Sequence, residues 1–96
     1  MSEADKFRAE VKENIEGLKK DHDVQALSSM WLREITRHKY AYNFNWMGRP
    51  IIQFQQDMIA MQEIIWDVQP DLIIETGIAH GGSAIFSASI LALLDY

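Results

Sequence analysis

Residues 71–94 constrain the fold more than any other part of this sequence of 96 residues. Residues 71–76 predict a strand, and because the apolar positions 72–74 do not alternate with polar ones, both faces of that strand should be covered. A glycine-rich turn follows at 76–83, and residues 84–94 read as a helix that is apolar almost all round. This order of strand, glycine turn and helix is half of a βαβ unit, so the sequence predicts an α/β fold with a parallel sheet.

Two amphipathic helices are predicted at the start of the chain. Residues 2–20 place apolar side chains at helical spacing, in the stripe Phe7, Val11, Ile15 and Leu18. Asp23 is the expected N-cap of a second helix that ends near His38, with an inner face of Val24, Leu27, Trp31 and Ile35.

The segment 39–50 alternates aromatic residues with alanine and asparagine, at Tyr40, Tyr42, Phe44 and Trp46. Alternation suggests extended backbone, but the asparagines and the sequence 48–50, Gly-Arg-Pro, favour an ordered loop, which is the structure we expect. The aromatic side chains either fix this loop on the core or form a wall that faces a substrate. A third helix should begin at residues 56–57 and stop before Pro70, with a buried stripe of Met58, Met61, Ile64, Ile65 and Val68.

Composition and charge exclude several classes of protein. Nine Lys and Arg against fourteen Asp and Glu give a net charge of −5 without a basic cluster, which argues against nucleic acid as a partner. The chain contains no cysteine, begins without a secretion signal and has no apolar run of the ~20 residues that a membrane span needs, so a cytoplasmic location is expected. No acid–base pair, nucleophile elbow or metal-ligand spacing occurs, and we assign neither a catalytic residue nor a metal ligand.

Two classes of cofactor use a glycine turn of this kind. A dinucleotide site requires G-x-G-x-x-G, which Gly77, Ala79 and Gly82 match only with alanine at the second glycine, and Glu75 fits that pattern badly. The other class is S-adenosylmethionine, whose amino-acid end carries an ammonium and a carboxylate. Glu75 can face the ammonium directly or through water, and the glycines let the backbone approach the ligand.

The carboxylate of S-adenosylmethionine would be received by the first backbone N–H groups of the following helix, helped by the hydroxyl of Ser83. The turn therefore predicts S-adenosylmethionine as the better fit, with an NAD-type oxidoreductase as the alternative. His80 is expected to be an exposed turn residue near this site. The third hypothesis is a non-catalytic helical module that binds a partner through its aromatic loop.

Separated stretches of this sequence, 45–53, then 56–58 with 62–65, and finally 70–83, resemble the cephalosporin hydroxylase / rhamnosyl O-methyltransferase family. The resemblance implies a class I S-adenosylmethionine-dependent methyltransferase fold with a doubly wound, Rossmann-like sheet. Its members act as O-methyltransferases on sugars, natural products or glycolipids, some with magnesium. The resemblance gives cofactor-binding roles to Glu75, Gly77, Ala79, His80, Gly81, Gly82 and Ser83, and places Gln53 and Asp57 close to the cofactor.

In that family an acid after the second strand binds the ribose, and the metal-binding and catalytic acids follow later. On this basis residues 1–39 are expected to be a helical lead-in, and 40–96 the start of the cofactor-binding domain, truncated before its second strand. We expect such an amino-terminal portion to be inactive alone. We also expect residues 71–94 to be poorly stable without further chain or a second copy, so a homo-oligomer is one outcome.

Overall fold

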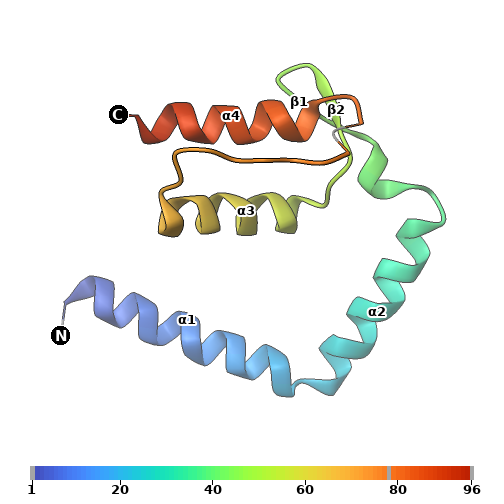
Figure 1. The fold of residues 1–96 in the computed structure, drawn as a ribbon. Coiled ribbons are helices and arrows are strands. Elements are labelled where there is room, and N and C mark those ends of the chain that lie inside the picture. Colours follow the sequence, from blue (N-terminus) through green and yellow to red (C-terminus); the bar gives the residue numbers. More distant parts are fainter. Residues whose placement is uncertain (1, 78, 96) are drawn as a thin grey trace. The chain divides into compact units, whose positions relative to one another are not determined.

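The computed structural model describes residues 2–77 and 79–95 (Figure 1). In these ranges the chain forms the helices α1 (Glu3–Lys20), α2 (His22–Thr36), α3 (Gln55–Val68) and α4 (Gly82–Leu94), the short 3-10 helix η1 (Tyr40–Tyr42), and the strands β1 (Phe44–Trp46) and β2 (Arg49–Ile51). The chain divides into two compact units, one up to His38 and one from Lys39 onward. The role of the first unit as a lead-in to a cofactor domain stays a prediction.

The first unit consists of α1 and α2, and each helix begins at a polar cap. The Ser2 hydroxyl accepts a hydrogen bond from the backbone N–H of Asp5 at 3.1 Å, and the Asp21 carboxylate accepts one from the N–H of Val24 at 3.1 Å. The predicted cap at Asp23 is therefore wrong, because Asp21 is the N-cap and Asp23 lies within the first turn of the helix. Neither helix contains a buried residue; of the predicted inner-face positions, Val24 and Ile35 are half-buried and the others are exposed.

The second unit begins with η1 and an antiparallel hairpin in which Phe44 pairs with Ile51 and Trp46 with Arg49. The expected ordered loop is thus wrong, and the alternation of residue types was the better signal. Met47 and Gly48 form the connection with φ angles of 48° and 80°. Two successive positive φ angles characterise the tight turns that match the twist of a hairpin.

The core of this unit lies where the hairpin packs on α4. Ile51 and Phe86 are 1% and 4% exposed, and the ring of Trp46 meets Phe86 edge-on with 4.9 Å between centroids. The indole N–H of Trp46 also donates a hydrogen bond to the Ser89 hydroxyl at 3.1 Å. Trp46 therefore fixes the aromatic segment on the core, as the first of the two interpretations expected, whereas Tyr42 is exposed.

Helix α3 ends as predicted, with Gln69 in the left-handed conformation immediately before Pro70. Its predicted buried stripe is mostly wrong, since Ile65 is buried but Ile64 and Val68 are 56% and 64% exposed. The reason is that α3 contacts α4 along one side only, and no sheet formed by the described residues covers the remaining apolar positions.

The predicted parallel strand at 71–76 is not formed. Figure 1 shows this segment as an uncoiled stretch between α3 and α4, and it carries no ladder hydrogen bonds to other described residues. Leu72 and Ile74 are 72% and 82% exposed, whereas Ile73 is half-buried. A strand requires a partner for its backbone N–H and C=O groups. Because the hairpin is the whole sheet within the described ranges, the structure shows a mixed helix–strand unit without the doubly wound sheet.

Candidate functional site

The turn between the extended segment and α4 has an unusual backbone. Gly77, Ala79 and Gly81 have positive φ angles of 68°, 51° and 84°, while Ile78 lies outside the described residues. Glycine adopts this left-handed conformation readily, which explains the residue type at 77 and 81. Alanine adopts it at a cost of about 1–2 kcal/mol. Strain of this kind at a non-glycine residue is concentrated at functional sites, so the turn is a candidate for one.

Glu75 connects the extended segment to the start of α4. The Ser83 hydroxyl donates to one carboxylate oxygen of Glu75 at 3.1 Å, and the Ser87 hydroxyl donates to the other at 3.4 Å. Ser83 and Ser87 are four residues apart and so lie on the same face of α4. The structure thus brings together Glu75 and Ser83, which the sequence had assigned to one site.

The same contact alters the role expected for Ser83. A serine hydroxyl has a single proton to donate, and here the proton of Ser83 is directed to Glu75. In this arrangement Ser83 cannot also donate to a ligand carboxylate. The remaining donors at this end of α4 are the backbone N–H groups of its first turn, since the N-cap Gly81 provides no side-chain hydrogen bond. They lie at the positive end of the helix dipole, where an anion is favoured.

A pocket of about 350 Å³ lies against this turn. Gly77, Ala79 and Ser83 form one part of its wall, and the chain from β2 toward α3 forms the rest: Pro50, Ile51, Ile52 and Gln53. Glu75 is linked to the wall through its hydrogen bond with Ser83. Segments about 30 residues apart in sequence therefore share one concave surface, as is typical of small-molecule sites.

Gln53 is the last residue of the pocket wall formed by the chain after β2. Its side-chain oxygen Oε1 is buried, and no group in the described ranges donates a hydrogen bond to it. The family resemblance had drawn attention to Gln53 together with Asp57, but no feature of the sequence shows that this oxygen is unpaired. Asp57 is exposed in the first turn of α3 and His80 is exposed in the glycine turn, and neither lines the described pocket wall.

Gly82 has a packing role that the sequence motif conceals. It is buried, and a side chain added there would collide with the Pro50 carbonyl oxygen and come within 2.8 Å of the Ile51 Cα. The missing side chain at 82 thus allows the hairpin to contact the first turn of α4. This contact accounts for the second glycine of the pair 81–82 without any ligand.

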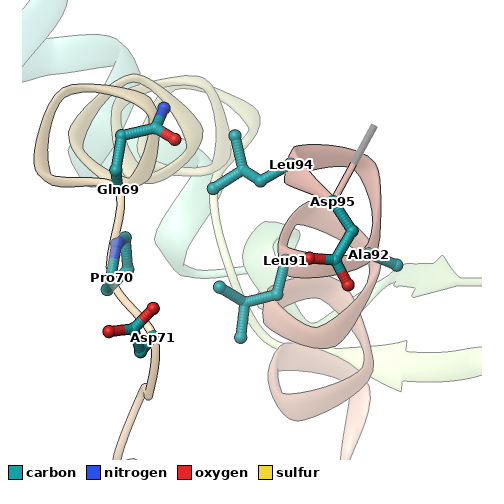
Figure 2. Close-up of a pocket in the computed structure, with 7 residues that line it drawn as sticks. All are labelled: Gln69, Pro70, Asp71, Leu91, Ala92, Leu94 and Asp95. Atoms are coloured by element: carbon teal, nitrogen blue, oxygen red, sulfur yellow. The ribbon is translucent and has the colours of Figure 1, made fainter.

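A second pocket, of about 310 Å³, lies at the opposite end of α4 (Figure 2). Asp71 lies on one side of it and Asp95 on the other, with Leu91 between them, and the helix C-terminus adds further negative potential. No residue assigned to a ligand from the sequence lines it. In the described ranges no three His, Cys, Asp or Glu residues are grouped to hold a metal ion.

None of the helices within 2–77 and 79–95 combines the length and apolar character needed to cross a bilayer.

Comparison with known proteins identifies the class to which the chain belongs. Residues 38–96 match a methyltransferase family, and the matched region contains the hairpin, the pocket and the glycine turn. The chain belongs to the Rhamnosyl O-methyltransferase/CmcI family. The resemblance found in the sequence is thereby confirmed.

Curated relatives of the chain include a rhamnosyl O-methyltransferase of Mycobacterium leprae (strain TN), which is 40% identical over 60 residues. This alignment covers 56% of the chain and 26% of the relative. Rhamnosyl O-methyltransferases of Mycobacterium tuberculosis (strain H37Rv) and Mycobacterium bovis (strain BCG / Pasteur 1173P2) are also 40% identical over 60 residues, covering 56% of the chain and 24% of each relative. The chain thus spans about a quarter of the length of these relatives. No solved structure matches it significantly.

Proposed function

We propose that this chain supplies the first part of the cofactor site of an S-adenosylmethionine-dependent O-methyltransferase. The acceptor we propose is a hydroxyl group of a sugar, a glycolipid or a natural product. Family membership and the relatives' names support methyl transfer to oxygen. When bound, S-adenosylmethionine supplies a methyl group on a positively charged sulfur. The residues of this chain would bind and orient its amino-acid end.

The residues at the turn fit such an amino-acid end. A carboxylate has about four sites that accept hydrogen bonds, and the two serine hydroxyls use two of those on Glu75. The remaining sites can accept from an ammonium group. The uncapped N–H groups at the start of α4 can donate to the carboxylate of the same ligand. One contact with a helix N-terminus contributes only about 0.3–1 kcal/mol, so several contacts must act together.

The observation that carries the proposal is the link between Glu75 and Ser83 beside the pocket of about 350 Å³. It places a carboxylate, a helix N-terminus and a ligand-sized cavity within one small region. A dinucleotide would bring its pyrophosphate to the same turn. There the negative charge of Glu75 would oppose it, which favours the zwitterionic amino-acid end.

The test is calorimetry on the full-length protein with S-adenosylmethionine, S-adenosylhomocysteine and NAD. The first two should bind and NAD should not. Glu75→Gln keeps the size of the side chain and removes its charge. A hydrogen bond to a charged group contributes about 1.5–3 kcal/mol, so this variant should weaken S-adenosylmethionine binding by about tenfold or more.

Glu63→Gln provides the matched control, because Glu63 is exposed on α3 and its substitution changes the net charge equally. It should leave the affinity unchanged. Unaltered binding by Glu75→Gln would remove Glu75 from the site. Binding of NAD in preference to S-adenosylmethionine would refute the proposed function itself.

A further inference from the structure

The helix α1 has an apolar face that is largely exposed. Four large apolar side chains on this face are between 37% and 66% exposed: Phe7, Val11, Ile15 and Leu18. Exposed apolar patches with polar borders are typical of surfaces that bind another molecule. The family match begins only at residue 38, so α1 lies outside the region on which the proposed methyltransferase function depends.

The next helix, α2, cannot cover this face. Because α1 ends at Lys20 and α2 begins at His22, Asp21 alone connects them. Two helices that fold back on each other need a connection of about 2–5 residues. The junction is also fixed by the side-chain amide of Gln25, which donates a hydrogen bond to the backbone oxygen of Leu18 at 3.0 Å. The partner of the α1 face must therefore be a different helix or surface.

The apolar face follows the heptad repeat of a coiled coil. Residues at alternating intervals of three and four lie along one side of α1, and we call this set the α1 seam: Ala4, Phe7, Val11, Asn14 and Leu18. In heptad terms the first, third and fifth of these are a positions, and the other two are d positions. All five are exposed in the structure. Such a seam fits an identical seam, because each side chain inserts between four side chains of the facing helix.

We infer that α1 is a self-association surface whose partner is the α1 helix of a second copy of this chain, aligned in parallel. Charges beside the seam set this orientation. Glu3 is at a g position on one side of the seam, and Arg8 is at the following e position on the other side. In a parallel pair these two positions meet across the interface, so Glu3 of each copy lies beside Arg8 of the other. Their side chains are 93% and 72% exposed, which leaves both accessible to a second chain.

Arg8 also contacts Asp5 within α1 at 2.7 Å, but a guanidinium has five N–H donors and can bind both carboxylates. An antiparallel pair is less favourable, because it would bring g positions together and place Glu10 of the two copies side by side. In the parallel pair Asn14 faces its own counterpart, and each amide can donate to the other.

A lipid surface is a poorer partner for α1 than a second copy. Helices that lie on anionic membranes are rich in Lys and Arg on their polar face. In α1, five Lys and Arg are balanced by five Asp and Glu, so the helix has no net attraction to such a surface.

The first experiment is sedimentation equilibrium of the 96-residue chain over a range of concentrations. We expect a reversible monomer–dimer equilibrium with a dissociation constant below about 1 mM. Val11→Glu puts a charge into the seam and should raise this constant by about tenfold or more. Ala9→Glu is the matched control, because it makes the same change of charge on the opposite, exposed face of α1, and it should leave the constant unchanged within about twofold. Circular dichroism should show that both variants keep α1 helical, since glutamate favours a helix more than valine does.

A second experiment tests the parallel orientation, and it is clean because the chain contains no cysteine. Ala4→Cys places a thiol at an a position, where the two copies meet in a parallel pair but not in an antiparallel one. With oxidised glutathione this variant should form a disulfide-linked dimer. Ala9→Cys, on the opposite face of the helix, should remain monomeric under the same conditions.

The inference is overturned if the chain is monomeric up to about 1 mM, if Val11→Glu and Ala9→Glu have equal effects, or if Ala4→Cys does not cross-link. Association that survives Val11→Glu and is lost in Leu72→Glu would also overturn it, because the contact would then lie at the exposed Leu72 of the extended segment. None of these measurements involves a methyl donor, so their outcome is independent of the proposed function.

Discussion

Substitution of Gly82 by alanine tests the contact that joins the hairpin to α4. An added Cβ would collide with the carbonyl oxygen of Pro50 and lie 2.7 Å from the Pro50 carbonyl carbon and 2.8 Å from the Ile51 Cα. These are backbone atoms, so no side-chain rotation relieves the contact. The hairpin or the first turn of α4 must move instead.

The size of the effect follows from two opposing terms. Overpacking a well-packed contact costs about 1–3 kcal/mol. Alanine gains about 0.5–1 kcal/mol over glycine inside a helix, and less at the first helical residue, where Gly82 lies. We therefore expect Gly82→Ala to lower the free energy of unfolding by about 1–2 kcal/mol. Movement of the hairpin would also increase the exposed fraction of the Ile51 and Phe86 side chains, which are almost fully buried.

The assay is urea denaturation of the chain followed by tryptophan fluorescence, to which Trp46 at this contact contributes together with Trp31 and Trp66. Gly17→Ala is the matched control, because Gly17 lies inside α1 and nothing lies within 4 Å of an added Cβ there. Gly17→Ala should be neutral or stabilising by up to about 1 kcal/mol. If Gly82→Ala behaved like this control, the close packing of the hairpin on α4 would be refuted.

Two further predictions concern the extended segment and the first helix. In the 96-residue chain, the amide protons of Leu72 and Ile74 should exchange with solvent faster than that of Phe86 in α4, because they have no ladder partner among the described residues. Hydrogen exchange measures this difference. Equal protection of the three amides would show that a strand is formed. The pKa of the Asp5 carboxyl should lie below its usual value of 3.8, because the Arg8 guanidinium and then the Ser2 hydroxyl bind its charged form. This stabilisation of α1 is present above the usual pKa and is lost as the pH falls through the lowered one. A carboxyl titration by NMR checks it, and Arg8→Ala should return the pKa toward 3.8.

Elements that depend on local interactions were predictable from the sequence. The helices α1, α2 and α3 follow from apolar spacing and from breaks at Asp21 and Pro70, since caps and helical periodicity involve residues only a few positions apart. The choice of Asp21 over Asp23 as the cap was not predictable. Both residues can accept from a free N–H, and which one does so depends on where the preceding helix ends.

Elements that depend on distant partners were predicted less well. The run 72–74 has the composition of an inner strand, but a strand is defined by its neighbours, and the described residues provide none for it. Asparagine and proline disfavour strands, so the sequence predicts a loop at 39–50, whereas the structure forms a hairpin there. Its packing against Phe86 overrides these weak preferences.

The site shows the same division between what residue types reveal and what only three-dimensional contacts reveal. Glycine at 77 and 81 is explained by positive φ angles, so the motif correctly indicated an unusual turn there. Glycine at 82 is explained by the approach of Pro50, so the third glycine of the motif gives no independent support for a ligand. The same approach brings the chain after β2, and with it Gln53, to the wall of the turn pocket. A single close backbone contact therefore weakens the assignment of Gly82 to the cofactor and at the same time brings into the site a residue that the glycine motif does not include.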